Sequence, residues 1–158
     1  MRQIITSFIL AAIATTTFAA QPAQWANKYP FDKIEGKTIF QTQEFKTILG
    51  KMPVSLQNKI VKQYSTTSDI KKSGSSILVT GCMPHMCNTA GYIFIYNTKS
   101  KEYWVLVDAM NASYDYEKTY CYSSSPNLSS MPIAFYNELK QYEGEEYLNR
   151  YMEGKVCK

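Results

Sequence analysis

The chain has 158 residues, which suits one domain with a substantial core of its own. Its formal net charge is +4 at pH 7, and no dense cluster of lysine and arginine occurs, so the composition argues against a nucleic-acid partner. Beyond the N-terminal region, no apolar run is long enough to cross a membrane.

The first residues have the pattern of a cleavable export signal. Arg2 provides a positive start, residues 4–18 are mainly apolar, and small residues occupy the two positions that a signal peptidase reads. We expect cleavage after Ala19, with Ala20 as the alternative, and no membrane association afterwards. The sequence therefore predicts a signal peptide over residues 1–19, a single domain over residues 20–158, and a periplasmic location.

The first third of the mature chain predicts an arm followed by two helices. Residues 20–37 are polar and contain proline, which favours an extended arm with Trp25, Tyr29 and Phe31 as its apolar anchors. Residues 42–50 predict a short helix, because apolar residues recur at helical spacing and a glycine follows. A weaker helical pattern begins at Pro53.

The middle of the chain predicts β-structure. Residues 75–80, 92–96 and 103–107 are rich in β-branched and aromatic residues, and a five-residue polar turn joins the last two runs as a hairpin. Residues 114–122 add a candidate strand, and Pro132 begins a helical pattern followed by a second apolar stripe over residues 147–152. The fold class that follows is α+β, with a central antiparallel sheet flanked by short helices.

Four cysteines behind an export signal predict two disulfides. Three pairings are open. Cys82 and Cys87 are only five positions apart, so a local bridge between them closes easily, and it leaves Cys121 to pair with Cys157. The second bridge would close a long loop and stabilise the domain by about 3–4 kcal/mol.

The segment between the first two cysteines carries the most specific pattern in the chain. A Cys82–Cys87 bridge would close a protruding loop around His85, the one histidine of the sequence, and Pro84 would stiffen its backbone. Met83 and Met86 add soft apolar surface beside the imidazole. The same residues also fit a stapled turn without a binding role, or a thiol-redox pair. Three candidate ligands make a poor metal site, and we expect no metal and no cofactor.

Residues 77–87 resemble the signature of the Ivy family, the bacterial inhibitors of vertebrate (c-type) lysozyme. That family carries a strand followed by a Cys-Lys-Pro-His-Asp-Cys loop, and this chain matches it at Cys82, Pro84, His85 and Cys87. The resemblance extends over roughly residues 43–108. It implies an α+β inhibitor and not an enzyme. It also allows a homodimer, although no residue pattern in this sequence indicates one.

The resemblance also implies a mechanism. The bridged loop would enter the cleft of a lysozyme-type peptidoglycan hydrolase, and His85 would meet the catalytic carboxylates, which lie about 5 Å apart in a retaining enzyme. Pro84 and the bridge would hold the loop rigid, and Met83 and Met86 would contact the rim of the target. An imidazole that hydrogen-bonds a carboxylate in a dry cleft makes a strong, charge-assisted contact.

The chain departs from the family loop at two positions. Met83 stands where the family has lysine, and Met86 stands where it has aspartate. The mature charge of +3 also gives no electrostatic attraction toward a basic lysozyme. These departures favour an alternative target with an apolar rim, such as a cell-wall-degrading toxin of rival bacteria, for which the chain would be a periplasmic immunity protein. A thiol-redox or structural envelope protein is the further alternative.

Overall fold

The computed structural model describes residues 19–111, 113, 116–125, 133, 135–137 and 140, and for Tyr116 and Glu117 it describes the backbone alone. The expected signal segment up to residue 18 therefore lies outside the described residues. So do Cys157, most of the expected C-terminal helix, and the apolar stripe over residues 147–152.

Between residue 19 and the first strand, the structure describes five short helices. They are the 3-10 helices η1 (Pro22–Trp25) and η2 (Ile39–Gln41), the α-helices α1 (Gln43–Leu49) and α2 (Val54–Asn58), and the π-helix η3 (Lys59–Gln63). The helices expected over residues 42–50 and from Pro53 are therefore confirmed. In the described part of the chain, no helix has the length and apolar character needed to cross a membrane.

The sequence predicted an extended N-terminal arm, but the arm is extended only in part. Residues 22–25 form η1, and a tight turn closed by the Ile34–Lys37 bridge follows. Trp25 is fully buried, and its Nε1 donates a hydrogen bond of 2.8 Å to the carbonyl of Asp32. Tyr29 is 54% exposed and does not serve as an anchor. The buried indole therefore fixes the arm against the domain.

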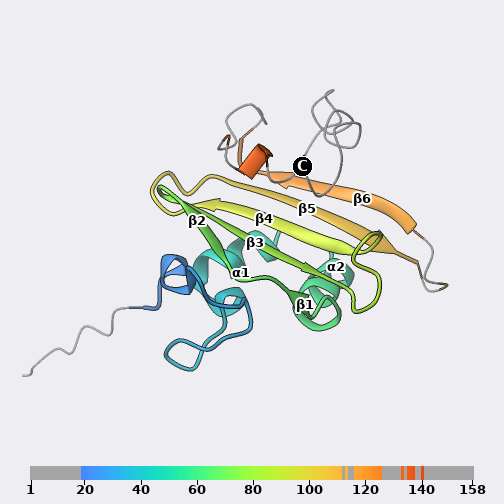
Figure 1. The fold of residues 1–158 in the computed structure, drawn as a ribbon, viewed down its shortest axis with the longest axis horizontal. Coiled ribbons are helices and arrows are strands. Elements are labelled where there is room, and N and C mark those ends of the chain that lie inside the picture. Colours follow the sequence, from blue (N-terminus) through green and yellow to red (C-terminus); the bar gives the residue numbers. More distant parts are fainter. Residues whose placement is uncertain are drawn as a thin grey trace, which may run out of the picture.

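One antiparallel sheet organises the described residues. Its strands are β1 (Thr66–Thr67), β2 (Lys71–Ser73), β3 (Ser76–Cys82), β4 (Gly91–Asn97), β5 (Tyr103–Met110) and β6 (Tyr116–Ser123). The spatial order is β1-β3-β4-β5-β6, and β2 pairs with the beginning of β3, whereas β1 pairs with its end (Figure 1). The predicted α+β class, the antiparallel sheet and the β4–β5 hairpin are confirmed; the short strands β1 and β2 were not expected.

The main core lies between the sheet and the helices, which cover one sheet face (Figure 1). Alternate residues of the central strands point to that face, and the register places Val79 of β3, Phe94 of β4 and Val105 of β5 side by side. Phe94 stacks on Phe45 of α1 with 5.5 Å between ring centroids. This packing joins the helices to the sheet and fixes which face of each strand is buried.

The opposite sheet face carries a smaller apolar cluster. Leu78, Ile95 and Trp104 are neighbours across β3, β4 and β5, and Phe135 packs on them. Phe135 belongs to the helical residues described after position 132, which supports the helix expected there. Both faces of the central strands are therefore covered, which explains why those strands read as nearly continuous apolar runs.

Candidate functional site

The site predicted from the sequence is the connection between β3 and β4. The Cys82–Cys87 disulfide is present, with 4.9 Å between the two Cα atoms, so the local pairing is confirmed. Cys121 is disulfide-bonded as well, while its expected partner lies outside the described residues. The loop leaves the sheet at the last residue of β3 and returns at the first residue of β4, since Cys82 pairs with Gly91 across the ladder.

A tight turn forms the apex of the bridged loop. The amide of Met86 donates a hydrogen bond of 3.0 Å to the carbonyl of Met83, which leaves Pro84 and His85 as the two central residues. His85 has φ of 66°, and a proline followed by a residue of positive φ is the pattern of a type II turn. Histidine adopts this region more readily than most residues other than glycine.

The loop exposes its apex, and its two methionines are half-buried. Pro84 and His85 are exposed, whereas Met83 and Met86 are half-buried and pack against the main core. The amide of Met83 also donates to the carbonyl of Ala90 at 3.0 Å, which continues the β3–β4 ladder into the loop. The methionines therefore hold the loop on the domain, and only part of their surface is open to a partner.

The base of the loop depends on close packing of the backbone against a ring, which was not predicted from the sequence. Gly81 lies against the ring of Tyr92, and a Cβ atom placed on Gly81 would come within 2.5 Å of that ring. On the other side of β3, Thr66 and Thr67 of β1 pair with Cys82 and Gly81. A glycine inside a strand is the signal that could have revealed this close approach.

The end of the sheet that carries the loop is also tied to η3 and its neighbour. The hydroxyl of Tyr64 donates to the carbonyl of Asp108 at 2.8 Å, and Nζ of Lys59 donates to the carbonyl of Met110 at 2.6 Å. Burial, assisted by the charge of Asp108, raises the pKa of Tyr64 to about 12. These contacts fix the ends of the strands beside which the loop stands (Figure 1).

The chemistry available at the loop is that of one imidazole on a rigid support. Within the described residues, no group of three or more histidine, cysteine, aspartate or glutamate side chains could hold a metal ion. Both loop cysteines are in the disulfide, so neither offers a thiol. The exposed His85 can donate or accept hydrogen bonds, and the turn and the bridge hold its backbone in place.

Fold and loop together define a small α+β domain that presents a cross-linked, histidine-bearing loop at one end of an antiparallel sheet. The family model described as inhibitor of vertebrate lysozyme (Ivy) matches residues 42–116, a little under half of the chain. The match confirms the resemblance seen in the loop, and the description of that family is of a lysozyme inhibitor. No curated protein and no solved structure matches the chain.

Proposed function

We propose that the protein is an exported inhibitor that inserts its bridged loop into the active-site cleft of a lysozyme-type peptidoglycan hydrolase. The observation that carries the proposal is the exposed His85 at the apex of a disulfide-closed turn, within the segment that matches the Ivy model. A loop already held in one conformation loses little entropy when it binds, so more of the contact energy contributes to affinity.

The target contact is an imidazole against a carboxylate pair. A retaining lysozyme holds its two catalytic carboxyl groups about 5 Å apart, close enough for one ring to reach both. Pro84 is exposed beside His85 and would fill the sugar-binding space, while the accessible parts of Met83 and Met86 would contact the cleft rim. The inhibitor would then block both the catalytic groups and the substrate.

Export fits the position of Ala20. This residue is 6% exposed and belongs to the main core, whereas Ala19 is exposed. Cleavage after Ala19 would retain the buried residue, and cleavage after Ala20 would remove it. We therefore favour a mature chain that begins at Ala20 and acts in the periplasm.

A second target class is favoured by the two methionines. Lysine and aspartate stand at these positions in the family loop, and their replacement lowers the polarity around His85. A bacterial muramidase with an apolar cleft rim would suit this surface better than a basic vertebrate enzyme would. The protein would then neutralise a toxin delivered by rival bacteria.

One experiment tests the mechanism and separates the two targets. The mature protein is assayed against c-type, g-type and bacterial muramidases, together with His85→Gly. Glycine removes the imidazole and accepts the positive φ, so the loop should keep its shape. We expect inhibition to weaken about 30-fold or more, as for a residue that anchors an interface.

The matched control is Asn88→Ala, an exposed substitution just outside the disulfide ring. It should leave inhibition unchanged. Full inhibition by His85→Gly would remove the loop mechanism, and failure of the wild-type protein against the whole panel would remove the hydrolase-inhibitor proposal. The enzyme class that is inhibited most strongly identifies the target.

A further inference from the structure

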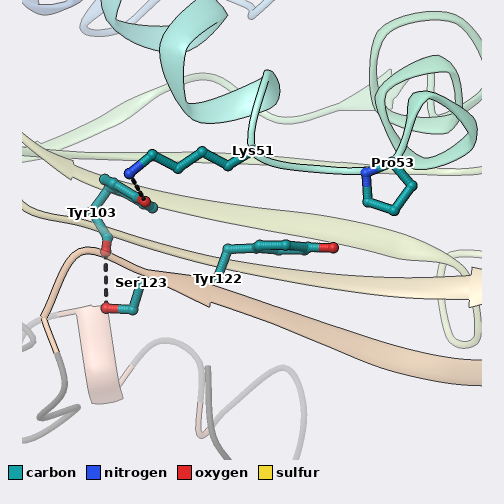
Figure 2. A pocket seen from close by; sticks show the side chains of 5 residues that line it. All are labelled: Lys51, Pro53, Tyr103, Tyr122 and Ser123. Atoms are coloured by element: carbon teal, nitrogen blue, oxygen red, sulfur yellow. Dashed lines mark hydrogen bonds between the residues drawn. The ribbon is translucent and has the colours of Figure 1, made fainter. Parts of the chain in front are cut away.

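A pocket lies at the end of the sheet opposite the bridged loop. The segment between α1 and α2 supplies Lys51 and Pro53, β5 begins there with Tyr103, and the end of β6 supplies Tyr122 and Ser123 (Figure 2). The cavity volume is about 310 Å³, which reaches the lower end of the range for small-molecule sites. None of its lining residues belongs to the bridged loop, so the proposed inhibitory surface does not account for it.

A cation stands at one side of this pocket. Nζ of Lys51 donates a hydrogen bond of 2.9 Å to the hydroxyl of Tyr103, and Lys51 is exposed. Among the described residues, no carboxylate forms an ion pair with Lys51. An ammonium group has three donors, so two remain for a ligand. A carboxylate complements these donors with charge-assisted hydrogen bonds.

Apolar ring surface and a tyrosine hydroxyl complete the pocket. Figure 2 shows the ring of Tyr122 below Pro53 and Lys51. Tyr122 is only 6% exposed, and none of the other lining residues drawn in Figure 2 forms a hydrogen bond with its hydroxyl. Ser123 is already engaged, because its Oγ lies within hydrogen-bond distance of the carbonyls of Tyr103 at 3.1 Å and Ser125 at 2.7 Å. Ser123 therefore forms part of the pocket wall, and the Tyr122 hydroxyl is the polar group that the other lining residues do not engage.

We propose that this pocket binds one pyranose ring that carries a carboxylate. The apolar face of the sugar would pack on the exposed ring of Pro53 and on the small accessible part of the Tyr122 ring, its carboxylate would contact Nζ of Lys51, and a sugar hydroxyl would bond to the Tyr122 hydroxyl. The small cavity suits a single substituted ring and not a glycan chain. This site is separate from the inhibitory loop, so either proposal can fail without the other.

Three small molecules divide the recognition into its parts. N-acetylmuramic acid has both the ring and the carboxylate, N-acetylglucosamine has the ring without the lactyl carboxylate, and lactate has the carboxylate without the ring. Each is titrated into the ¹⁵N-labelled mature protein while the backbone amides of Tyr103 and Ser123 are followed by NMR. We expect saturable shifts with N-acetylmuramic acid. The other two molecules should bind at least about tenfold more weakly.

Two variants and a control locate the ligand. Lys51→Met keeps the aliphatic stem and should weaken binding of N-acetylmuramic acid about tenfold, and Tyr122→Phe should weaken it several-fold. Lys46→Met, an exposed substitution on α1 outside the pocket, should bind like the wild type. Thermal unfolding of each variant checks that the fold is retained.

The remaining outcomes overturn the proposal. Equal affinity for N-acetylglucosamine would remove the carboxylate contact, and equal affinity for lactate would remove the sugar contact. No saturable shift, or shifts confined to other parts of the protein, would remove the site. We further expect Lys51→Met to inhibit hydrolases as the wild type does, and a parallel loss of inhibition would contradict the separation of the two surfaces.

Discussion

His85 shows why a single substitution at the loop apex must be chosen from the backbone as well as the side chain. Its φ of 66° lies in the left-handed region, where most residues with a Cβ atom are strained. His85→Ala would therefore remove the imidazole and also disfavour the turn, so a loss of inhibition would have two causes. Glycine and asparagine tolerate this region, and His85→Gly separates the imidazole from the turn.

Gly81 sets a second constraint at the residue scale. A Cβ atom on this residue would meet the Tyr92 ring at 2.5 Å, and that ring is buried and cannot move away freely. We expect Gly81→Ala to lower the free energy of unfolding by about 1–3 kcal/mol, the usual cost of overpacking a core. Urea unfolding followed by circular dichroism measures this change.

Thr80→Ala is the control for Gly81→Ala, because Thr80 is the adjacent, half-buried residue on the other face of β3. Its effect should stay within about 0.5 kcal/mol. In a Tyr92→Leu background the cost of Gly81→Ala should become smaller, since the opposing ring is gone. An unchanged cost in that background would show that the ring is not the cause.

At the scale of the element, the bridged loop has three independent constraints. They are the Cys82–Cys87 disulfide, the Met83–Met86 turn hydrogen bond and the packing of both methionines on the core. Only the first is covalent. The loop should therefore keep its place without the disulfide, but its apex should lose rigidity.

The double variant Cys82→Ser/Cys87→Ser tests this division. A ring of six residues contributes about 2 kcal/mol in the chain-entropy model, so the free energy of unfolding should fall by about that amount. Hydrogen exchange should accelerate at the Met86 amide, and inhibition should weaken about tenfold because ordering the loop becomes a cost of binding. Unchanged inhibition would show that the disulfide does not preorganise the site.

The sequence predicted the elements whose patterns are strong and local. The β-branched and aromatic content of residues 92–96 and 103–107 identified β4 and β5, and cysteine spacing identified the loop bridge. The strands β1 and β2 were not predicted, because segments of two or three residues show no periodicity. Only their pairing with β3 makes them strands. The anchoring of Met83 and Met86 also depends on tertiary packing, which no local pattern records.

At the scale of the whole molecule, tyrosines of the main core should make the free energy of unfolding fall at alkaline pH. Tyr64, Tyr92 and Tyr96 are each at most 2% exposed. Burial raises the pKa of Tyr92 far above its ordinary value, and it raises the pKa of Tyr96 to about 12 with a smaller contribution from the charge of Glu44. The folded protein therefore keeps these hydroxyls neutral at pH values at which they ionise in the unfolded chain.

The sign of the pH dependence follows from these shifts. Below pH 10 the hydroxyls are neutral in both states, so the stability they contribute is complete. Between pH 10 and about 12 only the unfolded chain loses their protons, and the free energy of unfolding should fall by about 1–3 kcal/mol for each such tyrosine. Urea unfolding at pH 8, 10 and 11, with tyrosinate absorbance near 295 nm, measures both effects.

Tyr96→Phe identifies the contribution of one hydroxyl to this alkaline loss. The Tyr96 hydroxyl is buried and has no hydrogen-bond partner among the described residues, so removing it should leave stability at pH 8 unchanged or raise it by up to about 1 kcal/mol. At pH 11 the variant should lose less stability than the wild type does. Tyr29→Phe, at a residue that is 54% exposed, should follow the wild type at every pH. If Tyr96 ionised together with the exposed tyrosines, its ring would be open to water and the main core would not close over β4 as described.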